Sequence, residues 1–478
     1  MLVALALYAP GCAVGPNFVP PKPPLTNAYT PEGTPAQTAT ADGRAQRFEP
    51  AGELPLAWWR TFHCPELDGR VDEAIAANPS LQAAQASLRQ SEDELRAGYG
   101  VFFPQADLGA GATREAPFVP VVGVGKPTLN VFTLSGAVSY VLDVFGGERR
   151  TVEGQRAQVD VQRYETAATY LTLVGNTVNA TISEAGYQAQ VEATQKLIAE
   201  LSDQVYITET QARAGTVAYV SVLALQTQLA ATEAQLPALE QRLTQSRHLV
   251  AALVGQEPAA WNPPSVELTS IEVPGDVPLT LPSELVHERP DILAAEAQLH
   301  RASAEIGVAT AAMFPQITLS GNYGWTATTT AALFSGPGAV WAVGADLATP
   351  LFHGGALWFQ RRAAIDAYEQ TLASYRQTVL SGLEQVADAL RALVHDAAQV
   401  EAQSRQEEAA SETLRLTEAN YRAGLANYLE VLIADVQKNQ ATITRIGGQA
   451  QRLQDTAALF VALGGRSWAA EELTRRDS

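Results

Sequence analysis

Two halves of this chain carry the same segments in the same order. The stretch ANPSLQAAQASLRQSEDEL, from Ala77, resembles ERPDILAAEAQLHRASAEI, from Glu288. The pairs VFFPQADLGAG and AMFPQITLSGN, LDVFGG and TPLFHGG, ARAGTVAYVSVL and YRAGLANYLEVL, and LVAALVG and LFVALGG follow in that order. The two members of each pair lie about 210 residues apart, which indicates a tandem duplication of one structural unit. Both halves must therefore adopt the same basic fold.

The duplication divides the chain into simple parts. A Pro-rich segment that breaks helical periodicity lies between the copies, and the stretch before the first copy has the Pro, Thr, Ala and Gly content of an extended arm. We expect residues 1–11 as a signal-peptide remnant, 12–62 as the arm, 63–254 as the first repeat, 255–282 as the connecting segment, 283–463 as the second repeat and 464–478 as a C-terminal tail.

Apolar and polar residues alternate in two segments of each repeat. These four predicted strands are about 102–113, 130–144, 315–328 and 339–351, and their length suits a tilted strand that crosses a membrane. The more polar face carries Ser135, Asp143, Thr318, Ser320, Asn322 and Asp346, as in a strand that lines a water-filled lumen. Taken singly, each strand better fits an ordinary half-buried sheet. The combination of four such strands with a secretory N-terminus and an otherwise helical chain favours the membrane.

Four strands leave two edges without partners. Lipid cannot hydrogen-bond the amide groups of an open sheet edge. A membrane-spanning barrel would therefore need strands from other chains. An eight-stranded barrel fills with its own side chains, so a pore favours three chains and 12 strands.

Each repeat ends in a very long helical hairpin. We expect continuous helices over 148–213 and 356–422, within hairpins 148–254 and 356–463. At 1.5 Å per residue, each long helix would reach roughly 100 Å. Gly215 and Gly424 are placed where a helix ends and the chain turns back. The sequence therefore predicts a mostly α-helical fold in which two long hairpins accompany four strands.

Composition excludes several classes of function. The net charge is −19, whereas proteins that bind nucleic acid cluster Lys and Arg against phosphates. The two cysteines, Cys12 and Cys64, give neither a disulfide framework nor a metal-ligand spacing. Asp143 and Asp346 resemble a catalytic carboxylate pair, but they occupy equivalent repeat positions, and we expect them to line the pore or the base of the barrel. The sequence predicts no enzyme, no metal and no cofactor.

The N-terminus resembles the end of a bacterial lipoprotein signal. Residues Leu2 to Ala9 are apolar and Cys12 follows closely, which makes Cys12 the expected lipidation site. No Lys or Arg precedes the apolar run, and Ala9 stands where Leu is usual, so an incidental cysteine is the alternative. A single lipid chain binds membranes only marginally. No later window is long and apolar enough to predict a transmembrane helix.

A set of motifs spread over nearly the whole chain resembles one known family. They are GCAVGPNFVPP, WWRTFHCPELDGRV, NPSLQAA, FPQ in both repeats, YVLDVFGGERR, HERPDILAAEAQL and YRAGLANYLEVL. The set is similar to the TolC-like outer-membrane factors of tripartite efflux systems, of the NodT type. The resemblance implies a homotrimer with a 12-stranded barrel in the outer membrane and a helical tunnel in the periplasm. It also implies a periplasmic adaptor, an inner-membrane transporter of the RND class and no catalysis.

The second hairpin tip carries the expected gate. In the family, acidic residues near this tip form a ring, and the usual Asp position is occupied here by Ile433. Glu430 lies three residues earlier and thus on the same side of a helix, whereas Asp435 points elsewhere. We expect Glu430 to be the constriction carboxylate, with Ile433 and Tyr421 beside it. The alternative is that Glu430 is a solvated surface residue.

The leading hypothesis is a lipid-anchored exit channel for drugs or other small molecules in the outer membrane. The same fold would also serve a type I protein secretion system, although the lipidation motif and ERPDI favour efflux. A soluble periplasmic coiled-coil scaffold is the alternative from a different class.

Overall fold

The structure is a computed structural model of the whole chain. It describes residues 13–464, except 27, 34, 51, 53, 117–127 and 335–337. The chain forms two compact units. The first contains residues up to 21, 87–163 and 294–376, and the second contains 22–86, 164–293 and from 377 onward.

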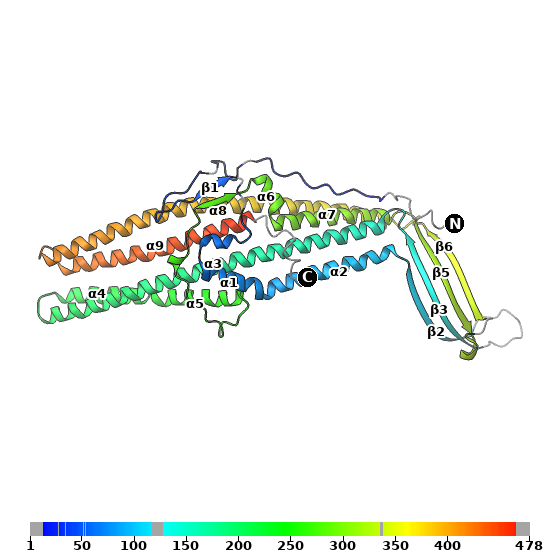
Figure 1. Cartoon of the computed structure of the whole chain (residues 1–478), viewed down its shortest axis with the longest axis horizontal. Coiled ribbons are helices and arrows are strands. Elements are labelled where there is room, and N and C mark those ends of the chain that lie inside the picture. Colours follow the sequence, from blue (N-terminus) through cyan, green and yellow to red (C-terminus); the bar gives the residue numbers. More distant parts are fainter. Residues whose placement is uncertain are drawn as a thin grey trace. The chain divides into compact units, whose positions relative to one another are not determined.

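The described chain is mostly helical, and the repeat predicted from the sequence is visible in the order of its elements (Figure 1). The first repeat is preceded by β1 (Arg47–Pro50) and contains α1 (Pro65–Ala77), α2 (Pro79–Gly98), β2 (Gln105–Glu115), β3 (Leu129–Leu142), α3 (Gly147–Arg213), α4 (Tyr219–Glu233) and α5 (Leu236–Leu253). The second is preceded by β4 (Asp276–Leu279) and contains α6 (Pro282–Glu288), α7 (Pro290–Ala311), β5 (Gln316–Ala327), β6 (Ala339–Ala348), α8 (Ala356–Arg422) and α9 (Tyr428–Leu463). No helix of the described residues is both long enough and apolar enough to cross a membrane.

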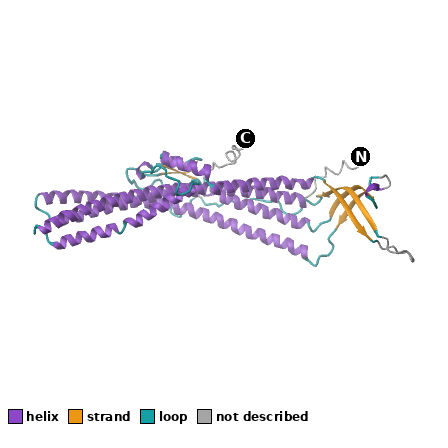
Figure 2. Cartoon of the chain, turned by 90° about the horizontal axis from the view of Figure 1, so that it is seen from below, coloured by secondary structure: helices purple, strands orange, loops and turns teal. Residues whose placement is uncertain are grey.

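The first unit holds one four-stranded antiparallel sheet in the order β2-β3-β5-β6, drawn in orange in Figure 2. The strands begin and end close to the expected positions. β2 starts just after Pro104 and β6 stops just before Pro350, since proline cannot donate to a ladder. Each repeat supplies two neighbouring strands, and the repeats meet where β3 pairs with β5.

The two long helices have the extents that the sequence predicts, but the two return helices differ. α9 is one helix of 36 residues. The first return is divided into α4 and α5 around Ala234, and Pro237 lies in the first turn of α5. Proline lacks an N–H group and clashes with the preceding turn in a helix interior, so the helix restarts with Pro237 at a tolerated position.

The core of the second unit brings the arm against the repeats. Trp58, Trp59 and Phe62 are buried, and the rings of Trp58 and Phe62 lie 5.6 and 6.2 Å from the ring of Phe460 on α9. The arm also pairs with the connecting segment, because β1 and β4 form a two-stranded parallel sheet. The sequence predicted an extended arm and a connecting segment, but no local pattern indicated that the two would pair.

Arg289, in the ERPDI motif, closes the C-terminal end of α9. Its Nη1 donates to the carbonyl of Ala462 at 2.7 Å, and its Nη2 donates to Asp291 Oδ2 at 2.7 Å and to Gln385 Oε1 at 2.8 Å. Gly464 follows α9 in the left-handed region, with a φ of +78°. A cation here satisfies a terminal carbonyl and complements the helix dipole.

Replacement of this buried arginine should destabilise the fold. We expect Arg289→Ala to lower the free energy of unfolding by about 1–3 kcal/mol, because the Ala462 carbonyl and the Gln385 amide oxygen lose a buried donor. The denaturation midpoint of the purified protein in detergent measures this loss. Arg301→Ala is the control, because Arg301 is half-exposed and pairs with Glu305 one turn along the same helix. Equal losses in both variants would contradict the assignment.

Candidate functional site

The two hairpin tips share one type of turn. Gly215 and Gly424 have φ values of +74° and +73°, which a residue with a Cβ rarely adopts. The Gly215 amide donates to the Ala212 carbonyl and the Thr216 amide donates to the Gln211 carbonyl, both at 3.0 Å. Gly424 and the residue after it make the equivalent two bonds. This pair of bonds is the Schellman motif, which ends a helix in a left-handed residue.

The tips differ in how the next helix begins. In the second repeat Asn427 is the N-cap of α9, and its Oδ1 accepts from the Glu430 amide at 3.1 Å. The Asn427 Nδ2 also donates to Glu430 Oε1 at 2.8 Å. The equivalent cap of α4 is Ala218, which makes no side-chain bond. The spacing Asn-x-x-Glu is that of a capping box, but here the Glu430 carboxylate accepts from the Asn427 side chain instead of the Asn427 backbone amide.

The predicted gate residues lie at the start of α9 and the end of α8. Glu430 is exposed, and the exposed fraction is 50% for Ile433 and 38% for Tyr421. The ring of Tyr421 lies 5.3 Å from the ring of Tyr428. The structure thus places Glu430 and Ile433 on the exposed surface of one helix turn, where the Glu430 carboxylate also accepts a hydrogen bond from the side chain of the N-cap residue Asn427.

Asp435 is turned toward α3 instead. Its carboxylate accepts from Gln204 Nε2 at 3.3 Å and from Asn439 Nδ2 at 3.1 Å. Burial raises the pKa of Asp435, and the negative charge of Glu200 adds to the rise. Asp435 therefore takes part in packing α9 against α3, which agrees with the expectation that it points away from Glu430.

The faces of the four-stranded sheet are separated by polarity, as the alternation predicted. Thr318 lies opposite Asp346, and Ser320 lies opposite Ser139 on β3 and Gly344 on β6. Ser135 and Asn322 occupy the same face, because strand residues two apart share a face. The other face carries Leu108, Leu134, Val138, Leu319, Tyr323, Trp325, Trp341, Val343 and Leu347.

The expected place of Asp143 on the polar face of a strand is wrong, whereas its alternative place at the base of the barrel stays a prediction. β3 ends at Leu142, and the Asp143 carboxylate instead caps α3. Its Oδ1 accepts from the Glu148 amide at 3.1 Å, and its Oδ2 accepts from the amide and the Nε of Arg149, each at 3.0 Å. A carboxylate is stabilised there by the free amides and the positive end of the helix dipole. Asp346, by contrast, does lie on its strand.

A second acidic position, which the sequence analysis missed, joins α8 to α9. Asp396 on α8 lies close enough to Asp455 on α9 for the two carboxyl groups to influence each other's protonation. Asp455 also lines a groove of about 460 Å³ between α3, α8 and α9. Burial and Asp455 raise the pKa of Asp396 to about 7, and Arg452 opposes the rise. The sequence offers no signal for this pair, because its members are far apart in the chain.

Arg452 fastens the arm to α9. It is buried, and its guanidinium donates to Gln46 Oε1 at 3.1 Å and to the carbonyls of Ala41 and Arg44 at 3.3 and 3.2 Å. Burial lowers its pKa, while the charges of Asp42 and Asp396 act in the opposite direction.

Cys12, the expected lipidation site, lies outside the described residues. Cys64 is buried and its thiol is free. Among the residues that the structure describes, no three His, Cys, Asp or Glu side chains are grouped as metal ligands would be.

Two long helical hairpins and a four-stranded sheet with one apolar and one polar face are features of the outer-membrane channel class. Residues 71–256 and 281–465 match the family described as outer membrane efflux protein, and the chain belongs to this family.

Named relatives are similar to this chain in sequence over nearly its full length. The chain is 28% identical over 465 residues to the pyoverdine export outer membrane protein OpmQ of Pseudomonas putida, covering 95% of this chain and 96% of that protein. It is 28% identical over 469 residues to nodulation protein T of Rhizobium leguminosarum bv. trifolii, covering 96% and 95%.

Two solved structures share the fold. The outer-membrane channel OprN is 26% identical with a TM-score of 0.80, over 96% of this chain and all of that chain. The CmeC outer membrane channel of Campylobacter jejuni is 18% identical with a TM-score of 0.87, over 97% of each chain. The chain is thus an outer-membrane efflux protein with the fold of solved channels.

The second hairpin tip, where Asn427 caps α9, should be more stable against local unfolding than the first tip. We expect Asn427→Ala to destabilise the first turn of α9 by about 1 kcal/mol, because the Glu430 amide loses its acceptor. Hydrogen exchange of the amides at the start of α9 measures this. The reverse change, Ala218→Asn, is the matched variant and should protect the start of α4. Unchanged exchange at both tips would refute the role of the cap.

The Asp396 pair should make stability depend on pH. The raised pKa means that the folded chain binds a proton more tightly than the unfolded chain, whose Asp has a pKa near 3.8. The free energy of unfolding should therefore fall as the pH rises from about 4 to about 7. Asp396→Asn and Asp455→Asn should each flatten this slope in denaturation measured across that range. A slope that persists in both variants would exclude the pair as its source.

Proposed function

We propose that this protein is the outer-membrane exit channel of a tripartite efflux pump and conducts small molecules passively to the exterior. The observation that carries the proposal is the sheet, whose polar and apolar faces are separated over four strands and whose edges are open. Membership of the outer membrane efflux protein family supports it. Passive conduction requires no catalytic step, so no residue is given a catalytic role.

The open edges support a trimer. Within the described part of the chain, β2 and β6 each pair on one side only. Edge amides have no partner in lipid, so these strands must pair with other copies to span a bilayer. Three copies of a four-stranded sheet would close a barrel of about 12 strands, wide enough for a water-filled channel.

The polar face would then line the lumen. Ser135, Thr318, Ser320, Asn322 and Asp346 would meet water. Trp325, Tyr323 and Trp341 on the opposite face have the aromatic character of residues at a lipid interface. Asp143, as the cap of α3, would lie at the base of the strands.

The hairpins would form the tunnel in the periplasm, with their tips toward the other pump components. The tips expose large apolar side chains: the exposed fraction is 80% for Leu425, 69% for Val220 and 65% for Tyr219. Apolar side chains exposed together mark an interaction site. We assign this surface to a periplasmic adaptor, which would join the channel to an inner-membrane transporter of the RND class. Lipid attached to Cys12 would add an anchor in the outer membrane.

The substrates are assigned only as small organic molecules. Relatives include proteins named for pyoverdine export and for toluene efflux. Selection would fall to the transporter, because an exit channel needs no specific pocket.

Neutralising Glu430 should change the ions that the channel admits. Three copies would place three Glu430 carboxylates around the mouth, where they attract cations. We expect Glu430→Gln to reduce the cation-to-anion permeability ratio of the purified trimer in planar bilayers. Glutamine can keep the capping bond, so the helix start should persist.

Glu412→Gln is the matched control, because Glu412 is an exposed carboxylate on α8 paired with Arg415. It should leave the permeability ratio unchanged. An unchanged ratio in Glu430→Gln would exclude Glu430 from the gate, and a protein that forms no conducting trimer would overturn the proposed function itself.

A further inference from the structure

The internal seam between the two repeats is closed by a pair of aromatic rings. β3 of the first repeat pairs with β5 of the second, and Leu142 at the end of β3 lies opposite Ile317. Just beyond these residues, the ring of Phe145 stacks on the ring of Phe314, with 4.8 Å between centroids and 23° between planes. Stacked rings attract each other beyond the effect of the apolar area that they bury. The stack therefore joins the repeats where the strands meet the helices.

Each repeat places a phenylalanine before its first long strand in the same backbone turn. The Phe314 amide donates to the Ala311 carbonyl at 3.0 Å, and the Phe103 amide donates to the Gly100 carbonyl at 3.1 Å. Both phenylalanines precede a Pro-Gln pair whose glutamine begins the strand, β5 or β2. Phe103 is thus the counterpart of Phe314, at the start of the open-edge strand β2.

Each repeat also places a phenylalanine between its second long strand and its long helix. Phe145 lies between β3 and α3, and Phe352 lies between β6 and α8. In both repeats the helix starts directly after a glycine with a positive φ, +80° for Gly146 and +85° for Gly355. Phe352 is followed by two extra residues before this glycine. It is thus the counterpart of Phe145 on a longer connection, beside the open-edge strand β6.

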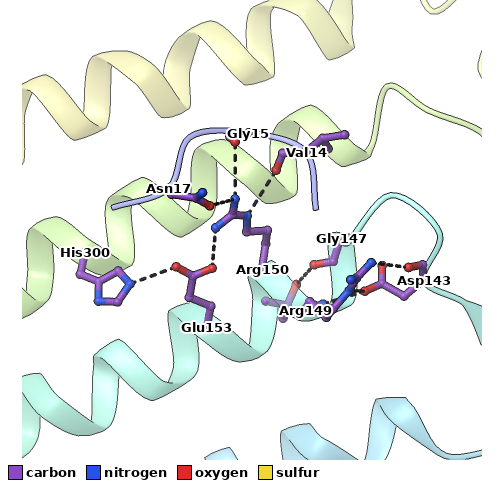
Figure 3. Close-up of polar contacts among 10 residues, drawn as sticks. Val14, Gly15, Asn17, Asp143, Gly147, Arg149, Arg150, Glu153 and His300 are labelled. Carbon is purple, nitrogen blue, oxygen red and sulfur yellow. Dashed lines mark hydrogen bonds and ion pairs between the residues drawn. The ribbon is translucent and has the colours of Figure 1, made fainter. Parts of the chain in front are cut away.

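The helices beside the internal stack approach each other through small residues. α3 begins at Gly147, next to the Asp143 carboxylate that caps this helix (Figure 3). A Cβ on Gly147 would lie 3.2 Å from the Cβ of Ala311, the last residue of α7. The counterparts are Ala356, which begins α8, and Gly100, so alanine and glycine have exchanged places. A Cβ on Gly100 would meet no described atom within 4 Å, which leaves room there for a neighbouring chain.

The rings of the internal seam and their counterparts differ in how far they are covered. At the internal seam Phe145 is part-buried and Phe314 is 36% exposed. Phe352 and Phe103 are 88% and 66% exposed. These two rings cannot stack within one chain, because two strands separate β2 from β6 and the gap is about 14 Å. Each outer edge of the sheet therefore carries one half of the pair that the internal seam contains.

A hollow of about 320 Å³ beside Phe103 provides further apolar surface at the β2 edge. Its lining includes Val101, Phe103, Tyr140 and Val141. A neighbouring copy that approached this edge with its exposed Leu351 and Phe352 would cover apolar side chains of both chains. Large apolar side chains exposed together mark a contact surface.

We propose that Phe352 of one copy stacks on Phe103 of the next copy and closes the junction between β6 and β2. The inference rests on the proposed function, in which further copies pair with these edges. The occupant is a second copy of this chain, because the internal seam already joins the same elements through the same two positions. A contact between two different surfaces of identical chains repeats around a ring. Every copy would therefore use Phe352 on one side and Phe103 on the other.

Cross-linking between copies tests the stack directly. Phe103→Cys combined with Phe352→Cys in the full chain should give covalent dimers and trimers on denaturing gels, above the level that the wild-type chain shows. The reagent is a short bifunctional maleimide that joins Phe145→Cys to Phe314→Cys within one chain. Trimers that yield no cross-linked product from the first pair would overturn the stack.

Phe103→Cys combined with Trp341→Cys is the matched control for the cross-link. Trp341 is also exposed on β6, but it lies seven residues before the end of this strand. Seven residues of strand span about 23 Å, so this pair should stay at the wild-type level. Equal cross-linking of both pairs would overturn the assigned contact.

Trimer stability shows whether the two rings act as a pair. We expect Phe352→Ala and Phe103→Ala each to lower the association constant in detergent about fivefold per interface. The double variant should lose no more than either single variant, because both changes remove one shared interaction. Phe334→Ala is the control, because Phe334 is exposed to a similar degree but contacts Trp325 of its own chain. Its effect should add fully to that of Phe103→Ala.

The same measurements separate the stack from the proposed function. Fully additive losses for Phe352→Ala and Phe103→Ala, or trimers of wild-type stability in both, would overturn the stack and leave the proposed channel intact. A wild-type chain that forms no trimer would overturn the proposed function, and the stack with it.

Discussion

Backbone hydrogen bonds at the edges of the sheet set the main constraint on this protein. β3 and β5 are paired on both sides, whereas β2 and β6 each present one row of amide and carbonyl groups that the described chain does not pair. In water such a row invites aggregation, and in lipid it is prohibitively costly. Pairing with further copies would satisfy these amide and carbonyl groups by closing a barrel. The polar face of the sheet would then face the interior of the barrel and the apolar face would face the lipid. The proposed trimer, its proposed lumen and its proposed contact with lipid would all follow from this one requirement.

The sequence predicted the features that depend on local periodicity. Repeated patterns of residues indicate the duplication, the long helices and the four alternating strands. The glycines at the tips indicate turns whose backbone conformation a residue with a Cβ rarely adopts. Features that depend on distant residues were missed. The pairing of β1 with β4 joins the arm to the connecting segment, and the Asp396–Asp455 pair joins two helices whose contact no local pattern reveals. The expected strand position of Asp143 was wrong for a different reason: the alternation of the sequence continues beyond Leu142, but the Asp143 carboxylate accepts hydrogen bonds from the free amides at the start of α3.

The two copies of the repeat differ in structure at the hairpin tips and in the return helices. Both tips keep the glycine turn, yet only the second has a side-chain cap, and only the first return is interrupted by proline. Besides the gate role proposed for it, the carboxylate of Glu430 bonds the capping residue Asn427, so a mutation to alanine would remove a charge and a capping partner together. The two hairpin tips show this sequence divergence most clearly, because they share one backbone conformation but differ in their side-chain hydrogen bonds.

The seam between β3 and β5 has a consequence for the origin of the protein. It joins the second strand of one repeat to the first strand of the next, and this is also the junction that β6 and β2 of adjacent copies would make. The chain thus contains, between its own halves, an equivalent of the contact expected between its neighbours. A half-length ancestor with one hairpin of strands would have required six copies to close the ring that three fused chains can close. Fusion would have halved the number of separate encounters needed and allowed alternate positions around the ring to evolve independently.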